Sequence, residues 1–248
     1  MTTPLVSVIV SAYNCEKFIE ESLRSIFNQT FRDFEIIVYN DASTDRTGKI
    51  IDNLLSEFSG KHIGIDRIIG SNIGCAEGRN KAIEKATGKY LAIQDGDDVS
   101  ENNRLEKEVN FIESIPDLFC VGSWANLIDC NGKHIGVFDY PHKEHNDTII
   151  DIFKMINPII DPSSLFRRDI FLKLGCYDTS YYLVPDLHLW VKAMLGGYYF
   201  ANILEKLVSY RRHKDSVMGK FSNIAIIQHR LLYKELIHKH KKEVFFRH

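Results

Sequence analysis

The fold is decided by a stretch near the amino terminus, Val6-Ser7-Val8-Ile9-Val10-Ser11-Ala12-Tyr13-Asn14. Its first five residues are almost continuously apolar, and polar residues follow soon after. A short apolar run of this kind is typical of a strand that is buried on both faces, as in a parallel sheet. The sequence therefore predicts a central strand at residues 6–10 that ends in a polar loop.

Strand and helix patterns alternate from this stretch to about residue 94. Further strand signals occur at residues 34–39, 63–69 and 90–94. Apolar residues recur at helical spacing between them, at Ile19, Leu23 and Ile26 and at Ile50, Ile51, Leu54, Leu55 and Phe58, and a third helix is expected from about Cys75 to Ala86. Asn14 and Ser43 are predicted to cap the first two helices. This β-α-β alternation predicts an α/β fold with a mostly parallel central sheet flanked by helices, and ligands bind such sheets beyond the carboxyl ends of the strands.

Composition places the chain among ordinary globular proteins. The 248 residues are 44% hydrophobic and 26% charged, and the net charge of −2 gives no reason to expect nucleic-acid binding across the surface. Five scattered cysteines without a C-x-x-C pair favour free thiols in a reducing compartment. The amino terminus does not resemble a secretory signal, and no apolar run approaches the ~18 residues that a membrane span needs. We therefore expect a cytoplasmic protein whose membrane contact, if any, is peripheral, at the inner face of the cell membrane.

The carboxyl-terminal half carries further sheet and helix signals. Residues 118–138 read as strands with a hairpin turn at Asn131-Gly132, and residues 187–195 read as a helix. From Ile224 to about His240 the pattern is helical and amphipathic, and this C-terminal helical tail has three open roles: packing on the domain, forming a homodimer or resting on a membrane surface. The basic cluster at residues 238–242 is either a solvated helix end or a site for anionic lipid.

Polar residues gather where the strands of the first half end. Ser11, Tyr13 and Asn14 follow the first strand, Asn40 and Asp41 follow the second, and Asp95, Gly96, Asp97 and Asp98 follow the fourth. An aspartate there can accept from the imide N–H of uracil, a tyrosine offers a stacking face, and a carboxylate cluster can hold a divalent cation against a diphosphate. Each motif alone is also typical of turns and helix caps, so their convergence on one crevice carries the inference.

These motifs resemble family 2 glycosyltransferases of the GT-A fold. The resemblance lies in residues 4–14, residues 36–47, Gly78-Arg79-Asn80, the D-x-D-like residues 94–98, residues 186–190 and the late loop at residues 210–216. It implies a Rossmann-like catalytic domain over residues 1–216, with a nucleotide-sugar-binding half at 1–99 and an acceptor-side half at 100–216. Residues 217–248 would then form the C-terminal helical extension.

The resemblance also implies a role for each matching residue. Asp41 would read the uracil of a UDP-sugar, Ser11 and Tyr13 would shape the nucleoside pocket, and Arg79 would pair with diphosphate or base-side oxygens. Asp95, with Gly96 beside it, would contact ribose or sugar hydroxyls. Asp97 would bind Mn²⁺ or Mg²⁺, joined by His213, for which a surface position in a basic loop is the alternative. Glu16 would reach the same pocket, or would serve only as a favourable carboxylate at a helix start.

The reaction implied is an inverting transfer to a hydroxyl of a carbohydrate or lipid-linked glycan acceptor. Asp186 is the candidate base by resemblance, and its alternative role is to cap the helix at residues 187–195. The expected context is bacterial surface-polysaccharide or lipid-linked oligosaccharide assembly. Three residues depart from the family pattern: Ser11 replaces a proline, Asn40 replaces a first aspartate, and Pro185 replaces an acidic residue before the base.

Other classes of protein stay open on sequence grounds. A nucleotide-sugar-binding protein without turnover would lose the base, and Asp186 is present. A dinucleotide oxidoreductase or a sugar nucleotidyltransferase has a similar sheet, but no G-x-G-x-x-G follows the first strand and no glycine-rich phosphate loop opens the chain. Residues 95–98 also lack the spaced ligands and closing glutamate of an EF-hand calcium loop.

Overall fold

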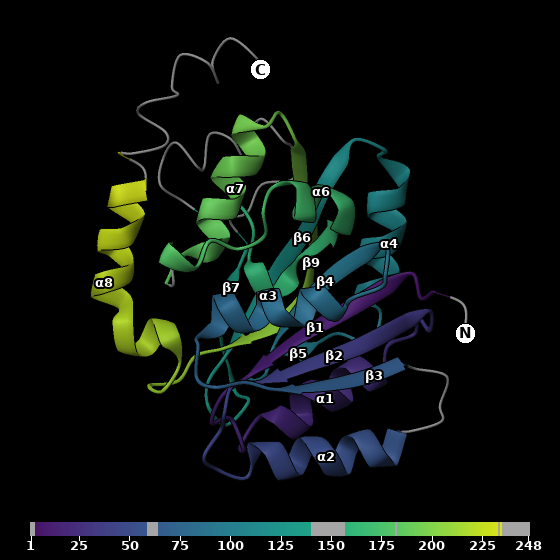
Figure 1. The fold of residues 1–248 in the computed structure, drawn as a ribbon, viewed down its shortest axis with the longest axis vertical. Helices are drawn as coiled ribbons and strands as arrows, with labels where there is room; N and C mark the ends of the chain where they lie inside the picture. The colour runs from purple at the N-terminus through teal and green to yellow at the C-terminus, as the bar shows by residue number, and fades with distance from the viewer. Residues whose placement is uncertain (1–2, 59–63, 140–156, 182, 233, 235–248) are drawn as a thin grey trace.

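The first half of the chain forms the alternating α/β layer that the sequence predicts (Figure 1). The structure, a computed structural model, describes residues 3–58, 64–139, 157–181, 183–232 and 234. Its first elements are β1 (Val6–Ala12), α1 (Ile19–Phe27), β2 (Phe34–Asn40), α2 (Thr47–Phe58), β3 (Gly64–Ile69), α3 (Cys75–Lys85) and β4 (Tyr90–Asp95). The predicted strands and helices of this half are therefore confirmed, with ends that differ by one or two residues and with α2 starting at Thr47.

One sheet runs through the whole domain in the order β3-β2-β1-β4-β8-β6-β9-β5. The pairs β2–β3, β1–β2 and β1–β4 are parallel. Beyond β4 the pairing is mixed: β8 (Leu165–Arg167) is antiparallel to both β4 and β6 (Leu118–Ile128), and β6 is parallel to β9 (Tyr199–Arg211). The sheet thus joins a parallel half to a mixed half along one continuous surface.

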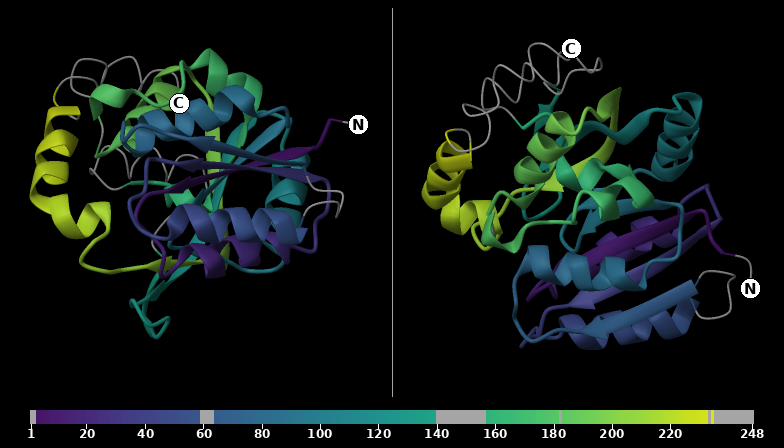
Figure 2. Two further views of the ribbon diagram at one scale, coloured as in Figure 1. Left: turned by 60° about the horizontal axis from the view of Figure 1, so that its bottom comes forward. Right: turned by 45° about the horizontal axis from the view of Figure 1, so that its top comes forward.

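The core lies on both faces of this sheet because its central strands are apolar on both sides. In β1, Val8 and Val10 face the helices α1 and α2, whereas Ile9 faces α3 and α7 (Pro185–Leu195). Successive side chains of a strand point to opposite faces, so an unbroken apolar run supplies both cores. Figure 2 shows the strands of the parallel half between α3 on one side and α1 and α2 on the other.

Two predicted helix caps are wrong. The helix α1 begins at Ile19 after Phe18, and Asn14 lies outside it with a φ of 47° and accepts a hydrogen bond from the N–H of Thr44 at 2.8 Å. Ser43 Oγ in turn accepts from the N–H of Asn14 at 3.0 Å, and Asp45 Oδ1 accepts from the first N–H of α2. Asn14 and Ser43 therefore join the loop after β1 to the loop after β2, since each side chain accepts a hydrogen bond from the backbone of the other loop.

The second half contains β5 (Val99–Ser100), α4 (Arg104–Ser114), β7 (His134–Phe138), a 3-10 turn η1 (Asp161–Ser163), α6 (Arg168–Lys173) and a second turn η2 (Thr179–Tyr181). The predicted hairpin is confirmed, since β7 is antiparallel to β6. Its loop spans residues 129–133 and is closed by the N–H of Asp129 donating to Lys133 O at 2.9 Å. Gly132 takes a φ of 79°, which glycine adopts without strain.

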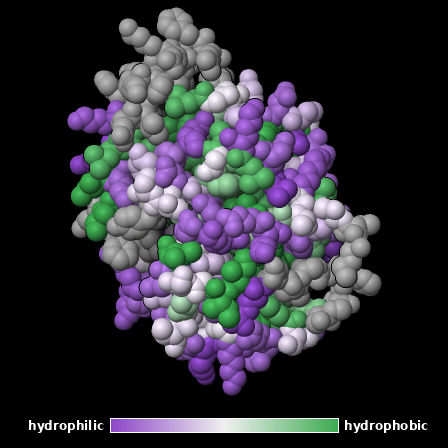
Figure 3. Space-filling view, viewed as in Figure 1, coloured by the Kyte–Doolittle hydropathy of each residue, from purple (hydrophilic) through white to green (hydrophobic). Residues whose placement is uncertain are grey.

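The helix α8 (Val217–Leu232) packs at the edge of the domain. It begins earlier than predicted, Leu232 is buried in the core, and Gln228 accepts a hydrogen bond from the N–H of Leu183 at 3.1 Å. Ile224, Ile227 and Leu231 are exposed, and Figure 3 shows apolar side chains along this edge. Of the described helices, none has the length and apolarity to cross a bilayer. The basic cluster at residues 238–242 lies outside the described residues.

Candidate active site

The carboxyl ends of β1, β2 and β4 bring the predicted polar residues to one edge of the sheet. Ser11 pairs in register with Tyr39 on one side and with Asp95 on the other. Its hydroxyl donates to Asp95 Oδ1 at 3.2 Å and lies 3.6 Å from the Sγ atom of Cys75. Parallel pairing therefore joins the loop after β1 to the acidic loop after β4 and to the first residue of α3.

Asp41 is buried at the same edge. Its two carboxylate oxygens accept from the backbone N–H groups of Ile73 at 2.9 Å and Gly74 at 2.8 Å, directly before α3. Tyr13 is 49% exposed in the loop after β1, so its ring has an accessible face. The carboxylate of Asp41 is thus fixed by backbone donors, and each of its oxygens keeps one further lone pair for a ligand.

Glu16 is bound to the loop that precedes α2. Its Oε2 atom accepts from the backbone N–H of Arg46 at 2.9 Å and from Arg46 Nε at 3.0 Å. These hydrogen bonds lower the pKa of the Glu16 carboxyl. The contacts give Glu16 a structural partner outside the group of Ser11, Asp95 and Cys75.

Arg79 is buried between two carboxylates. Its Nη2 atom lies 2.5 Å from Asp95 Oδ1, and its Nη1 atom lies 2.5 Å from Asp161 Oδ2. Burial alone would lower the pKa of Arg79, but the charges of Asp95 and Asp161 outweigh it and raise the pKa well above its ordinary value. Arg79 is therefore a fixed cation that links the end of β4 to the turn η1.

The acidic loop gathers three carboxylates within a small volume. Ligand atoms of Asp95, Asp97 and Asp98 all lie within 4.8 Å of one another. Gly96 allows this close turn, because a Cβ atom there would lie 2.9 Å from the carbonyl oxygen of Ser11. Asp97 Oδ2 also lies 2.8 Å from His213 Nε2, so the structure brings together the two residues that the sequence predicts as metal ligands.

These residues fit a hard divalent cation such as Mn²⁺ or Mg²⁺. Such cations prefer carboxylate oxygens, and imidazole binds divalent transition-metal ions. Asp98 is buried, and its Oδ2 atom has no hydrogen-bond partner among the described residues. Burial, and after it the charges of Asp97 and Asp95, raises the pKa of Asp98 well above its usual range. A buried carboxylate oxygen without a hydrogen-bond partner in the described part of the chain, such as Asp98 Oδ2, is stabilised when a cation binds beside it.

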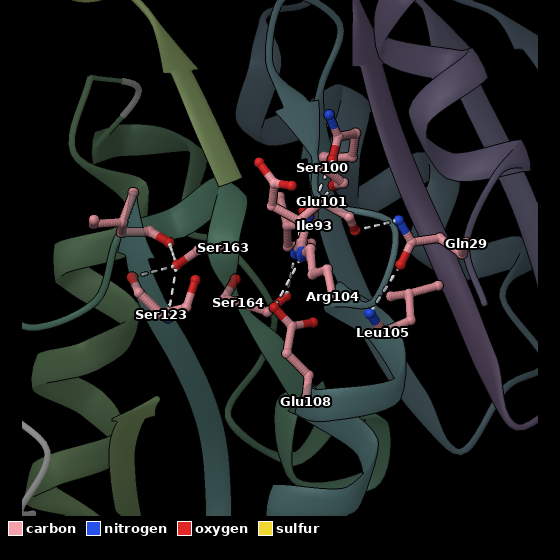
Figure 4. Close-up of polar contacts among 12 residues, drawn as sticks. Gln29, Ile93, Ser100, Glu101, Arg104, Leu105, Glu108, Ser123, Ser163 and Ser164 are labelled. Carbon is pink, nitrogen blue, oxygen red and sulfur yellow. Dashed lines mark hydrogen bonds and ion pairs between the residues drawn. The ribbon is translucent and has the colours of Figure 1, made fainter. Parts of the chain in front are cut away.

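A buried polar network around Gln94 supports the backbone of the acidic loop. Gln94 Nε2 donates to the carbonyl oxygen of Asp98 at 2.8 Å, and Gln94 Oε1 accepts from Ser100 Oγ at 2.7 Å and from Arg104 Nη1 at 3.0 Å. Figure 4 shows Arg104 directed toward the neighbouring backbone, with Glu108 beside it. The loop that carries the carboxylates is therefore held by side chains that are themselves buried and hydrogen-bonded.

Arg211 fixes the late loop against the same carboxylates. Its backbone N–H donates to Asp98 Oδ1 at 2.7 Å, its Nε atom donates to the carbonyl oxygen of Asp97 at 2.7 Å, and Nη2 pairs with Glu21 at 2.6 Å. Arg211 ends β9, so the sheet delivers His213 to the acidic loop across more than a hundred residues of sequence. The family resemblance includes this loop at residues 210–216, but it predicts no role for Arg211.

Asp186 lies in the first turn of α7. The helix begins at Pro185 after Val184, so Asp186 is not the N-cap residue, and the Nδ2 atom of Asn157 donates to Asp186 Oδ2. Asp186 is half-buried, and burial raises the pKa of its carboxyl although hydrogen bonds from backbone N–H groups and from Asn157 oppose this. The position at a helix start also favours a negative charge.

Asp161, Tyr177 and Asn157 also belong to this site, although no motif in the sequence marks them. The hydroxyl of Tyr177 donates to Asp161 Oδ1 at 3.0 Å. Burial raises the pKa of Asp161 to about 7; the Arg79 charge opposes the rise, and the charges of Asp186 and Asp95 add to it. Asp161 is followed by a proline and two serines, which is an ordinary turn pattern, so nothing local distinguishes it.

The parallel β-α-β half ends in a carboxylate loop, and Arg79 joins Asp95 of this loop to Asp161 of the second half. The chain belongs to glycosyl transferase family 2, whose model matches residues 7–175. It is therefore an enzyme that transfers sugars.

Two relatives illustrate the similarity. The chain is 35% identical over 223 residues to an uncharacterized glycosyltransferase of Methanocaldococcus jannaschii, covering 89% of this chain and 75% of that protein. It is 27% identical over 215 residues to the amylovoran biosynthesis glycosyltransferase AmsE of Erwinia amylovora, covering 86% and 78%.

Two solved structures share the fold. One is residues 1–349 of S. aureus TarS in complex with UDP-GlcNAc, with a TM-score of 0.72, 21% identity and coverage of 94% of this chain and 66% of that chain. The other is the mannosyltransferase PcManGT from Pyrobaculum calidifontis in complex with GDP-Man and Mn²⁺, with a TM-score of 0.71, 21% identity and coverage of 96% and 69%.

Proposed function

We propose that this enzyme transfers a sugar, with inversion of the anomeric centre, from a UDP-sugar to a hydroxyl of a glycan or lipid-linked glycan. The observation that carries the proposal is the position of the acidic loop: it meets His213 on one side and, through Asp95 and Arg79, the acceptor-side turn on the other. This is the arrangement needed to hold a diphosphate and a sugar between a cation site and a base.

On the donor side, Asp41 binds the uracil, Ser11 and Tyr13 form the nucleoside pocket, and Asp95 and Gly96 meet the ribose or the sugar. The proposal is supported by the register of Ser11 with Asp95 and by the accessible ring of Tyr13. The donors named in the two similar structures, UDP-GlcNAc and GDP-Man, support a nucleotide-sugar and make GDP the base to test against UDP.

Asp97 and His213 are proposed to hold Mn²⁺ or Mg²⁺, with Asp98 close by. When bound, the cation supplies positive charge to the diphosphate that leaves. Arg79 pairs with Asp95 and holds that carboxylate in place, and Gln94 Nε2 donates to the backbone of the acidic loop. In this role the chain contributes preorganised charge, which needs no rearrangement at the moment of transfer.

Asp186 is proposed as the base that accepts the proton of the incoming hydroxyl. Burial raises its pKa, which makes the ionised carboxylate a stronger proton acceptor than an exposed aspartate. Asn157, which donates to one carboxylate oxygen, orients the group. The presence of this base favours turnover over a nucleotide-sugar-binding protein without activity.

We also propose residues 1–216 as the catalytic domain, divided at residues 99 and 100 into donor and acceptor halves, with residues 217–248 as an extension. We propose surface-polysaccharide assembly as the context, and the similarity to an amylovoran biosynthesis glycosyltransferase supports a role in polysaccharide biosynthesis. A cytoplasmic location, peripheral membrane contact through the extension and a homodimer are parts of this proposal that need separate tests.

The test is a thermal-shift and hydrolysis screen of UDP-sugars and GDP-sugars with and without Mn²⁺. We expect UDP to stabilise the protein only when Mn²⁺ is present, and Asp97→Ala to abolish this stabilisation. Asp169→Ala, which removes an exposed carboxylate at the start of α6, is the matched control and should behave as wild type. Equal stabilisation by UDP in the presence of a chelator would refute the metal site, and hydrolysis that persists in Asp186→Asn would remove the base assignment.

A further inference from the structure

The turn η1, with Asp161 at its start, is held rigidly between the two halves of the sheet. Ser163 Oγ accepts from the N–H of Ser123 at 3.0 Å and donates to the carbonyl oxygen of Ile160 at 2.7 Å. The carbonyl oxygen of Ser164 accepts from the N–H of Ile93 at 3.0 Å. Figure 4 shows Ser163 hydrogen-bonded to Ser123 on β6, and Ser164 facing Arg104. Residues from β4 and β6 thus fix the backbone around Asp161.

The carboxylate of Asp161 uses both oxygens. Oδ2 lies 2.5 Å from Arg79 Nη1, and Oδ1 accepts from the hydroxyl of Tyr177 at 3.0 Å. The guanidinium of Arg79 also lies 5.6 Å from the centre of the Tyr177 ring. All three residues are at least nine-tenths buried. Truncating Asp161 would therefore leave a buried guanidinium with one carboxylate partner in place of two.

The same short segment reaches the acceptor side. Asn157, four residues before Asp161, donates to Asp186. Asp161 and Asp186 are close enough for the charge of one to act on the other. The described groups that act on Asp161 are Arg79 on α3, Asp95 on β4, Tyr177 before η2 and Asp186 on α7. Burial raises the pKa of the Cys75 and Cys120 thiols, and the charge of Asp161 adds to the rise.

We propose that Asp161 is a positioning residue of the transfer reaction: its carboxylate holds Arg79 where that guanidinium also binds Asp95, and the segment before it supplies Asn157, which donates to the base Asp186. This inference rests on the proposed function, in which Asp95 lies on the donor side and Asp186 is the base. Arg79 then links the donor-side carboxylate Asp95 to Asp161 in the turn η1 on the acceptor side.

The arrangement has a consequence for pH. Burial raises the pKa of Asp161 to about 7, so its charge changes near neutral pH. The ionised form pairs with Arg79 and adds negative charge beside Asp186, which increases the tendency of Asp186 to take up a proton. Activity should therefore rise as the pH passes through about 7, and this rise should depend on Asp161.

The decisive experiment is an NMR titration of protein labelled with ¹³C in the aspartate carboxyl groups, with the Asp161 signal assigned by its absence in Asp161→Asn. We expect a midpoint far above those of exposed aspartates. Asp186→Asn removes a neighbouring negative charge and should lower the midpoint. Tyr177→Phe removes a hydrogen bond to the ionised form and should raise it. A midpoint in the range of exposed aspartates, or one that Asp186→Asn leaves unchanged, would overturn the inference.

The second arm measures hydrolysis of UDP-N-acetylglucosamine with Mn²⁺ between pH 5.5 and 8.5. Asp161→Asn should lower kcat about ten- to a hundred-fold, the scale typical of groups that orient ligands, and should lose the rise near pH 7. UDP binding should stay within a few-fold of wild type. Asp169→Asn serves as the matched control. A variant that is only less stable, with an unchanged pH profile, would contradict the positioning role. If wild type neither binds UDP nor turns over, the proposed function fails while the titration still decides the charge relation of Asp161 and Asp186.

Discussion

Replacing Glu108 with glutamine should make the free energy of unfolding of the variant, relative to that of wild type, increase as the pH rises. Glu108 is fully buried on α4; its Oε1 atom accepts from Arg104 Nε at 2.8 Å, and its Oε2 atom has no hydrogen-bond partner among the described residues. Burial raises the pKa of this carboxyl from 4.5 to about 7, against the opposing charge of Arg104. The folded protein therefore binds a proton at Glu108 more tightly than the unfolded chain does.

The sign and size of the effect follow from this difference. A group whose pKa is higher in the folded state contributes stability that is complete below pH 4.5 and is lost as the pH rises through about 7. At about 1.4 kcal/mol for each pKa unit, the difference corresponds to about 3.5 kcal/mol at most. The ion pair between Arg104 and Glu108 can adjust when Glu108 becomes charged, and this adjustment offsets part of the cost. We therefore expect a measured change on the order of 1 to 3 kcal/mol. Glutamine keeps an oxygen that can accept from Arg104, and it has no proton to lose as the pH rises.

The assay is equilibrium urea unfolding of wild type and Glu108→Gln at pH 5, 6, 7 and 8. The free energy of unfolding of the variant, relative to wild type, should increase across this range. Glu106→Gln, on the exposed face of the same helix, is the matched control and should show no such increase. A difference between wild type and Glu108→Gln that is independent of pH would refute the reasoning.

Three further changes test the site and its scaffold. Asp186→Asn should lower transfer about a hundred-fold or more while UDP binding with Mn²⁺ stays within a few-fold, and equal losses in both would point to a misfolded site. Gly88→Ala should destabilise the protein by about 1–3 kcal/mol in urea unfolding, because its Cβ would lie 2.6 Å from the backbone nitrogen of Ser7; a neutral result would mean that the backbone shifts freely there. Trp190→Ala should cost about 3–5 kcal/mol of unfolding free energy, since the indole is fully buried and stacked 5.3 Å from the ring of Phe166, and a loss below about 1 kcal/mol would contradict this packing.

The parallel half of the sheet was predictable because its signals are local. Mostly apolar runs such as residues 6–10 and 90–94 predict strands that are buried on both faces, and the structure confirms them. The mixed half was less predictable. The strand β8 has three residues and β5 has two, and neither is long enough to show a period. The parallel pairing of β6 with β9 joins segments that are far apart in the chain.

The helix caps failed for a related reason. Asn14 and Ser43 are good capping residues, but each serves the other's loop, because the parallel pairing of β1 and β2 places the two loops side by side. Local propensity cannot detect a partner about thirty residues away. Asn14 and Ser43 were therefore predicted to cap helices, whereas each forms a hydrogen bond that connects the two loops.

The candidate site was predictable only where a motif carries it. Asp97 and His213 were expected together, and they lie 2.8 Å apart. Asp161 was missed because its partner Arg79 lies 82 residues away and the sequence around Asp161 is an ordinary turn. Asp161 belongs to the site because it is buried beside Arg79. This burial arises only when the sheet is assembled, so the local sequence does not show it.

The central claim is that the carboxylates of the acidic loop and of α7 face one bound donor. A crystal structure of the protein with UDP and Mn²⁺, with the manganese identified by its anomalous signal, tests it most directly. We expect the metal to be held by Asp97 and His213, with uracil at Asp41 and with Asp186 facing the site of the sugar. Manganese bound elsewhere, or UDP bound away from this edge of the sheet, would contradict it.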